Sequence, residues 1–285
     1  MNFQERYDVY TNKIFNNNYN YNFIIDKKYI EYKNNYPLYI THDLNNNINY
    51  KNEIKNNNIS DFIIVTDDGY ENNNMPCFQK TRKINNHSDL SLLLKLQFGR
   101  HWGPFYTFKD NYEWTSKKNE IIWRGAPTGN GDRIKFCDLY YKKYNVGLSC
   151  IFDYIPQYSY LQKSEISLDD FCKYKYIISI EGNEKDSGIN WKLASNSVVL
   201  MKQPIYESWL MESKLEPWIH YIPLKEDFSD IDEIYLWCLN NDDKCREITL
   251  NANKFMDNFR NIDLEEKLIN KIEFDYFKHI KLELI

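Results

Sequence analysis

The sequence predicts an α/β fold, and three observations lead to this prediction. Short β-branched runs at 62–65, 120–123, 176–180 and 197–201 are each followed by polar or glycine-containing residues, as strands ending in loops are. The stretches 133–144, 191–195 and 230–258 space their apolar residues as helices do. Strands and helices alternate almost to the end of the chain, which is the layout of an α/β protein.

The length of 285 residues exceeds one ordinary domain of about 100–200 residues, so either two smaller lobes or one large α/β domain is expected. A polar stretch at 109–120 suggests a boundary there. We therefore expect an N-terminal lobe at 1–119 and a C-terminal lobe at 120–259, with a cleft between them. The last stretch, 264–285, alternates Glu and Lys with apolar residues and predicts a closing amphipathic helix.

Composition argues against several classes of function. The net charge is −5 and no Lys/Arg block is present, so a nucleic-acid partner is not expected. No run of about 18 apolar residues and no signal-peptide pattern is visible, which predicts a cytoplasmic protein without an integral membrane segment, in the host cytoplasm if the source is a virus. Six scattered cysteines without a Cys-x-x-Cys predict free thiols rather than a zinc site.

Three of the nine glycines fall in one short loop, Trp123-Arg-Gly-Ala-Pro-Thr-Gly-Asn-Gly-Asp-Arg133, after a predicted strand and before a predicted helix. Such a loop exposes backbone N–H groups and the positive end of a helix. Arg124 and Arg133 add cations that suit a diphosphate. An ordinary surface loop with two solvated arginines would show the same spacing.

A second loop follows the apolar run 174–180, and ligands of open α/β sheets bind at the carboxyl ends of strands. Lys192 could meet a phosphate there, and Asn190 or Ser187 a ribose or sugar hydroxyl. The alternative for Lys192 is a solvated lysine at a helix start. Farther on, two prolines bracket a predicted short strand at 217–223, where His220 is either a ligand-binding or a hydrogen-bonded structural residue.

These segments together resemble glycosyltransferase family 90. The resemblance is carried by four motifs in order: Trp123-Arg-Gly-x-x-Thr-x-x-x-Asp-Arg133, Tyr174-Lys-Tyr-Ile-Ile-x-Ile-x-Gly182, Trp191-Lys-Leu-x-Ser-x-Ser-Val-Val-Leu200 and Pro217-Trp-Ile-His-Tyr-Ile-Pro-Leu-x-x-Asp227-x-Ser-Asp230. It covers about residues 120–255 and implies a two-lobed GT-B fold of two Rossmann-like lobes. It also implies inverting transfer of a sugar, glucose or xylose, from a UDP-sugar to a hydroxyl of a glycan or protein acceptor, with no cofactor and no required metal.

The resemblance also implies roles for single residues. The family's catalytic base is an Asp after an N-lobe strand, which makes Asp67 the first choice and Asp68 the second. The implied donor-binding residues are Arg124, Gly125, Thr128, Arg133, Glu181, Gly182, Ser187, Asn190 and Lys192. His101 and Trp102 are expected on the acceptor side, and the helix at 260–285 is expected to pack back on the N-terminal lobe.

The sequence departs from the family in features of the Rumi-type members. Their cysteines and C-terminal retention tetrapeptide are absent, and Asn190 stands where the family has an Arg. One alternative is a metal-dependent GT-A-like transferase in which Asp67 and Asp68 bind the metal. Another is a catalytically inactive carbohydrate-binding relative whose aromatic residues stack on sugars.

Overall fold

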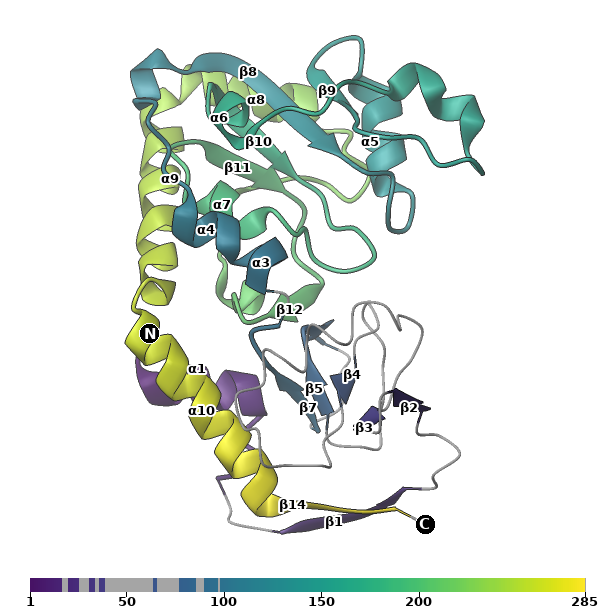
Figure 1. Cartoon of the computed structure of the whole chain (residues 1–285). Helices are drawn as coiled ribbons and strands as arrows, with labels where there is room; N and C mark the ends of the chain where they lie inside the picture. The colour runs from purple at the N-terminus through teal and green to yellow at the C-terminus, as the bar shows by residue number, and fades with distance from the viewer. Residues whose placement is uncertain are drawn as a thin grey trace. The chain divides into compact units, whose positions relative to one another are not determined.

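The computed structural model of the protein describes residues 1–16, 20–25, 31–33, 36–38, 64–65, 77–85, 90–96 and 98–284. Backbone contacts divide the chain into two compact units (Figure 1). Unit 1 consists of Met1–Phe98, Ile205–Glu212 and Phe259–Ile285, and unit 2 of Gly99–Pro204 and Ser213–Asn258. Residues 99–119, which the sequence analysis assigns to the N-terminal lobe, thus lie in unit 2. Among the described residues, no helix combines the length and apolar character needed to span a membrane.

Unit 2 is built on a sheet of five parallel strands (Figure 1). The strands are β8 (Lys118–Gly125), β9 (Asn145–Leu148), β10 (Tyr174–Ser179), β11 (Val198–Met201) and β13 (Ile222–Pro223). Their order across the sheet is β13, β11, β10, β8, β9. The runs predicted at 120–123, 176–180 and 197–201 are its three central strands, so the α/β class is confirmed.

Helices cover both faces of this sheet. Ile121 and Trp123 pack in one apolar layer with α5 (Asp132–Tyr140), α8 (Ile231–Asn240) and α9 (Asp242–Met256). Ile122 belongs to a second layer with Phe171 of α6 (Leu168–Phe171) and Trp191 of α7 (Ile189–Leu193). Successive strand residues point to opposite faces, so covering both faces requires the unbroken apolar runs that the sequence shows.

The strand order reverses between β8 and β10. The chain leaves β8 through α5 and returns as β9 on one side, whereas β10 continues through α7 to β11 on the other side. Loops at such a reversal diverge at the carboxyl ends of the strands, which is where open α/β sheets bind ligands. The loops after β8 and β10 contain the residues that are expected to bind the donor.

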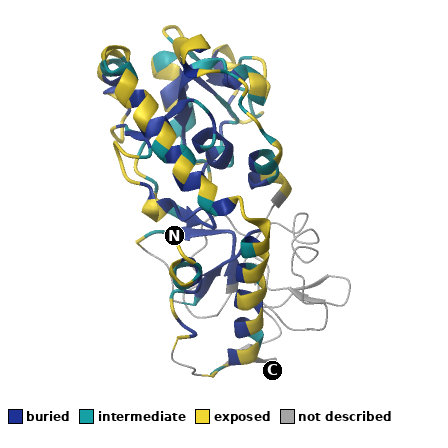
Figure 2. Ribbon diagram, turned by 90° about the vertical axis from the view of Figure 1, so that its left-hand side faces the viewer, coloured by how far each residue is buried: buried dark blue, intermediate teal, exposed yellow. Residues whose placement is uncertain are grey.

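Unit 1 gathers chain segments that are distant in sequence. Its described elements are α1 (Phe3–Thr11), β1 (Tyr21–Ile25), β2 (Glu31–Lys33), β3 (Tyr36–Leu38), β4 (Ile64–Val65), β5 (Cys77–Gln79), β6 (Thr81–Lys83), β7 (Ser91–Leu93), β12 (Tyr206–Ser208), α10 (Ile262–His279) and β14 (Ile280–Leu284). The parallel strands β4, β5 and β7 form one small sheet, and β12 pairs with β6. Helix α10 buries one face and exposes the other (Figure 2).

Three predicted elements differ from the structure. The closing helix ends at His279, and Ile280–Leu284 pairs in parallel with β1, because this segment alternates apolar and charged residues with the period of a strand. The predicted helix at 230–258 is two helices, α8 and α9, which meet at Asn241, whose φ of −132° is not helical. The predicted strand at 217–223 is mostly a turn around Trp218, with only β13 at its end.

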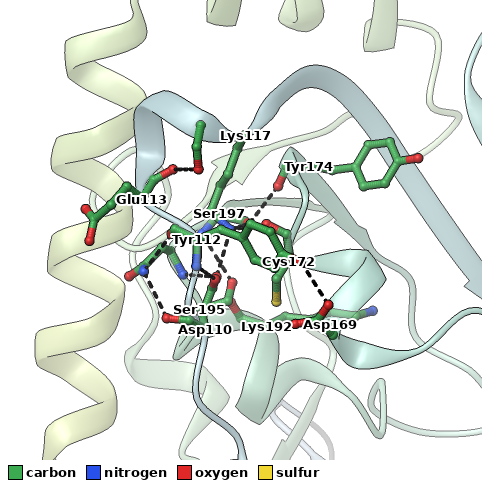
Figure 3. A network of polar contacts seen from close by, with 12 residues as sticks. Asp110, Tyr112, Glu113, Lys117, Asp169, Cys172, Tyr174, Lys192, Ser195 and Ser197 are labelled. Carbon is green, nitrogen blue, oxygen red and sulfur yellow. Dashed lines mark hydrogen bonds and ion pairs between the residues drawn. The ribbon is translucent and has the colours of Figure 1, made fainter.

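A buried polar network holds the amino ends of β10 and β11 (Figure 3). The Lys117 ammonium contacts Asp110 Oδ2 at 2.7 Å, Ser197 Oγ at 3.1 Å and the carbonyl oxygen of Cys172. The same Asp110 carboxylate accepts the backbone N–H of Asn196 at 2.8 Å. The segment before β8 is thereby attached to the sheet of unit 2, which explains why residues 99–117 belong to this unit.

We expect Asp110→Ala to destabilise unit 2 by about 3–5 kcal/mol, because it leaves the fully buried Lys117 ammonium without its carboxylate. The measurement is chemical unfolding of the variant and the wild type. Asp169→Ala is the control, since that carboxylate is 60% exposed and its ion pair with Lys173 is long, at 4.0 Å. Surface pairs contribute at most about 1 kcal/mol, so equal losses in both variants would contradict this reading of the network.

Candidate functional site

The loops after β8 and β10 touch at two glycines. Gly129 has φ +94°, and a Cβ on it would lie 2.5 Å from the carbonyl oxygen of Gly182. A Cβ on Gly182 would in turn lie 2.9 Å from Thr128 Oγ1. The backbone N–H of Gly129 donates to Asn183 Oδ1 at 2.8 Å. Only glycine permits this backbone approach, so the two glycine-containing loops form one structural site at the reversal of the sheet.

Arg133, in the first turn of α5, links the two loops. Its Nη1 donates to Thr128 Oγ1 at 2.7 Å and to the carbonyl oxygen of Ala126 at 3.1 Å. Its Nη2 and Nε donate to the carbonyl oxygens of Ile180 and Glu181, at 2.9 and 3.2 Å. A guanidinium has five N–H donors, and these contacts use four. Within the described parts of the chain, one Nη2 N–H of this half-buried cation has no acceptor. The guanidinium also forms no ion pair with a described residue.

The amino end of α5 adds backbone donors beside Arg133. The N-cap residue is Gly131, whose φ is +95° and which has no side chain to accept from the helix. Asn130 Oδ1 accepts the backbone N–H of Asp132 at 3.1 Å, so the N–H groups open to an anion are those that follow Asp132. The N–H groups of a first helical turn have no partner within the helix, and they carry the positive end of its dipole. An anion at this end of α5 would therefore meet both backbone N–H groups and the guanidinium.

Sequence reasoning missed Lys202, which follows β11 at the same edge of the sheet. Its ammonium contacts Asp132 at 2.5 Å and Glu226 at 3.0 Å, so it joins the start of α5 to the loop after β13. Burial opposes the charge of Lys202, but hydrogen bonds to Asp132 and Glu226 outweigh that effect and raise its pKa. The only signal in the sequence was its position directly after a predicted strand.

Lys192 is buried in an ion pair and is not a solvated lysine. Its ammonium is buried and contacts Asp186 Oδ2 at 2.5 Å and the carbonyl oxygen of Ile178 at 3.1 Å. Burial by itself would raise the pKa of Asp186, but the nearby charges of Lys192 and Arg133 outweigh it and lower that pKa to about 2. The structure thus places Lys192 in an ion pair inside the loop after β10.

Asn190 lies in the first turn of α7 and is fully buried. Its Oδ1 accepts from Lys185 Nζ at 3.1 Å, while its Nδ2 has no hydrogen-bond partner among the residues that the structure describes. A buried donor without a partner is costly, so this amide is suited to an acceptor atom on a ligand. Ser187 and the Glu181 backbone lie in the same loop, both half-buried.

Arg124 contacts the neighbouring strand β9. Its neighbour Trp123 is buried in the core, so Arg124 points to the opposite face of β8. Its guanidinium donates to Asn145 Oδ1 at 2.7 Å and to the carbonyl oxygens of Asn145 and Trp123 at 2.9 and 2.8 Å. Gly125, which ends β8, stands where the strand leads into the glycine-rich loop.

The remaining predicted residues lie elsewhere. His101 and Trp102 are both buried, and the Trp102 ring packs edge-on against Phe105. His220 is half-buried and its Nδ1 accepts the backbone N–H of Glu216 at 3.0 Å, which holds the turn around Trp218. Asp67 and Asp68 lie outside the described residues.

Comparison with known proteins agrees with the motifs of these loops. The sequence model of glycosyl transferase family 90 matches residues 106–280. The O-glucosyltransferase LpsA of Dichelobacter nodosus is 33% identical over 191 residues, which are 67% of this chain and 58% of that protein. Protein O-glucosyltransferase 2 of Danio rerio is 27% identical over 186 residues, 64% of this chain and 35% of that protein. The match thus spans little more than half of one of these curated relatives and about a third of the other.

Among solved structures, a glycosyltransferase from Rickettsia africae ESF-5 aligns with a TM-score of 0.45 and 11% identity, over 76% of this chain and 71% of that one. A likeness at this level supports no inference about the fold. The sequence match, in contrast, covers more than half of the chain and includes β8, α5, β10 and α7 with their loops. This protein belongs to glycosyl transferase family 90.

Proposed function

We propose that this protein transfers a sugar from a UDP-sugar to a hydroxyl group of a glycan or protein acceptor, with inversion at the anomeric carbon and without a metal ion. The observation that carries the proposal is the contact between the Gly129 and Gly182 loops at the sheet reversal, linked by Arg133. Membership of the family supplies the reaction class. Glucose is the proposed sugar because the named relatives are O-glucosyltransferases, and xylose is the alternative.

The proposed donor site lies at the start of α5. The diphosphate would accept the unused Nη2 N–H of Arg133 and the backbone N–H groups of the first helical turn. Thr128 Oγ1, held at 2.7 Å from Arg133 Nη1, would lie beside it. The Nδ2 of Asn190 offers a donor to a hydroxyl of the ribose or the sugar. Arg124 is left out of this site because its guanidinium contacts Asn145 instead.

In the proposed reaction one carboxylate acts as general base. Asp67, or Asp68 as the second choice, takes the proton of the acceptor hydroxyl while that oxygen attacks the anomeric carbon. The bond from this carbon to the β-phosphate oxygen breaks on the opposite side, so the configuration inverts and UDP leaves with the electron pair. The guanidinium and the helix N-terminus stabilise the charge that develops on the diphosphate.

We expect Arg133→Ala to weaken UDP binding at least about tenfold, since it removes a charge-assisted contact worth about 1.5–3 kcal/mol and the link between the loops. Arg124→Ala is the matched control, because this arginine lies on the neighbouring strand end but contacts Asn145. Calorimetric titration with UDP, after thermal unfolding has shown that both variants are folded, measures the difference. If Arg133→Ala bound UDP as tightly as Arg124→Ala and the wild type, Arg133 would not be part of the donor site.

The donor itself can be identified by thermal stabilisation and by slow hydrolysis. A ligand that binds only the folded state raises the melting temperature, so a panel of UDP-glucose, UDP-xylose, UDP-galactose, UDP-N-acetylglucosamine, dTDP-sugars and GDP-sugars ranks the candidates. The same turnover assay in EDTA separates this mechanism from a metal-dependent one. Loss of turnover in EDTA, restored by Mn²⁺ or Mg²⁺, would favour a metal-bound diphosphate.

A further inference from the structure

A buried ion pair joins the loop after β10 to helix α7. Asp186 and Lys192 are both buried, with their side chains 10% and 5% exposed. The carboxylate lies in the loop and the ammonium in α7.

Both members of the pair also bind the backbone or side chains of neighbouring elements. Asp186 Oδ2 accepts from Ser179 Oγ at 2.7 Å, at the end of β10, and its Oδ1 accepts the backbone N–H of Gly188 at 2.9 Å. Lys192 Nζ donates to the carbonyl oxygen of Ile178, also on β10, at 3.1 Å. The pair therefore fixes the distance between the end of β10 and the start of α7, and with it the path of the loop between them.

The same loop carries the backbone that Arg133 and Gly129 contact. The carbonyl oxygens of Ile180 and Glu181 accept from Arg133, and Gly182 lies against Gly129. Asn190, whose Nδ2 has no partner within the described part of the chain, follows two residues after Gly188 in the first turn of α7. A shift of the loop would therefore move both groups that the proposed function gives to the donor.

We propose that Lys192 and Asp186 are positioning residues that hold the donor loop in its binding conformation, and that the Lys192 ammonium does not itself contact the donor phosphates. The identity of the ligand, a UDP-sugar, is taken from the proposed function, on which this proposal therefore rests. The Lys192 ammonium is buried and two of its three N–H donors are used by Asp186 and by the carbonyl oxygen of Ile178. Its charge is neutralised by a carboxylate that stays ionised, since Lys192 and Arg133 lower the pKa of Asp186 to about 2 against the effect of burial.

A double-mutant cycle on UDP binding distinguishes the two roles. If the pair positions the loop, Asp186→Asn and Lys192→Met should each weaken UDP binding by about tenfold, and the double variant should bind no more weakly than either single variant. The double variant contains no unpaired buried charge, so it keeps the test valid if a single variant unfolds. If Lys192 contacts phosphate directly, Asp186→Asn will retain or improve UDP binding while Lys192→Met weakens it, and this result would overturn the proposal.

The Lys117–Asp110 pair is the matched control. It is at least as deeply buried but lies at the amino ends of β10 and β11, away from the two loops. The variant with both Asp110→Asn and Lys117→Met should bind UDP within about twofold of the wild type, because distant sites act independently. A tenfold loss in this control as well would show that any buried pair of unit 2 matters for binding, which contradicts a specific role for Asp186 and Lys192.

Hydrogen exchange in the absence of ligand tests the positioning separately from the proposed function. In Asp186→Asn and Lys192→Met, the amides of residues 182–189 should exchange faster, while those in the middle of β10 keep their protection. Unchanged exchange in the loop would refute the positioning role. If the wild-type protein does not bind UDP but the loop exchange responds as expected, the proposed function fails and the positioning role stands.

Discussion

Glu265→Ala is expected to destabilise unit 1 by about 3–5 kcal/mol or more, because one buried carboxylate neutralises two buried cations. Glu265 Oε1 lies 2.5 Å from Arg6 Nη2 and Oε2 lies 2.7 Å from Lys95 Nζ, and all three side chains are at most 3% exposed. The indole N–H of Trp209 also donates to Oε2 at 2.7 Å. The substitution would leave both cations and the indole without this acceptor.

Chemical unfolding followed by circular dichroism measures this loss. Glu266→Ala is the control, since it removes the same charge from the next residue of α10 at an exposed position. It should cost less than about 1 kcal/mol. A Glu265→Ala variant as stable as this control would show that the buried cations find other partners, and that the ionic cluster does not hold the segments of unit 1 together.

The central sheet of unit 2 could be predicted from sequence because its signals are local. Each of β8, β10 and β11 contains an apolar run that is followed by a polar or glycine-containing loop, and both features lie within a few neighbouring residues. The same holds for the glycine loops and Arg133, which the structure brings together. Composition and spacing were sufficient here because a parallel sheet puts successive strand ends on one edge.

The direction of single side chains could not be predicted in this way. As cations next to glycine-containing loops, Arg124 and Lys192 both suit a phosphate, yet in the structure each has a protein partner that the sequence does not identify. Asn145 accepts from Arg124 across the sheet, and Asp186 is one of several acids near Lys192. A cation near a ligand site is distinguished from a structural one by its partner, and the partner is set by tertiary packing.

Unit 1 was difficult to predict for a related reason. Its core joins α1, β12 and α10, and its ion pairs connect residues as far apart as Arg6 and Glu265. No local period in the sequence marks such pairs. The end of α10 shows a second limit. The segment after His279 alternates apolar and charged residues as a strand does, but it can be assigned as a strand only once β1 is known to pair with it.

The largest effect on catalysis is expected from Asp67→Asn, which should lower the transfer rate by about 10²–10⁴ because the amide cannot accept the proton of the acceptor hydroxyl. The proposal rests on the resemblance and on the position of Asp67 after β4. In the sequence Asp67 comes two residues after β4, a described strand that pairs in parallel with β5. UDP affinity should be unchanged, since the base contacts the acceptor and not the diphosphate.

Asp68→Asn is the comparison that identifies the base. Successive residues of an extended chain point to opposite sides, so the two acids are not expected to share the role. The experiment measures transfer rate and UDP affinity for both variants with one donor and one acceptor. A fully active Asp67→Asn enzyme would exclude Asp67, and an inactive Asp68→Asn enzyme with normal UDP affinity would then assign the base to Asp68. If both variants lost UDP binding together and regained it with added Mn²⁺, the two carboxylates would be metal ligands of a different mechanism.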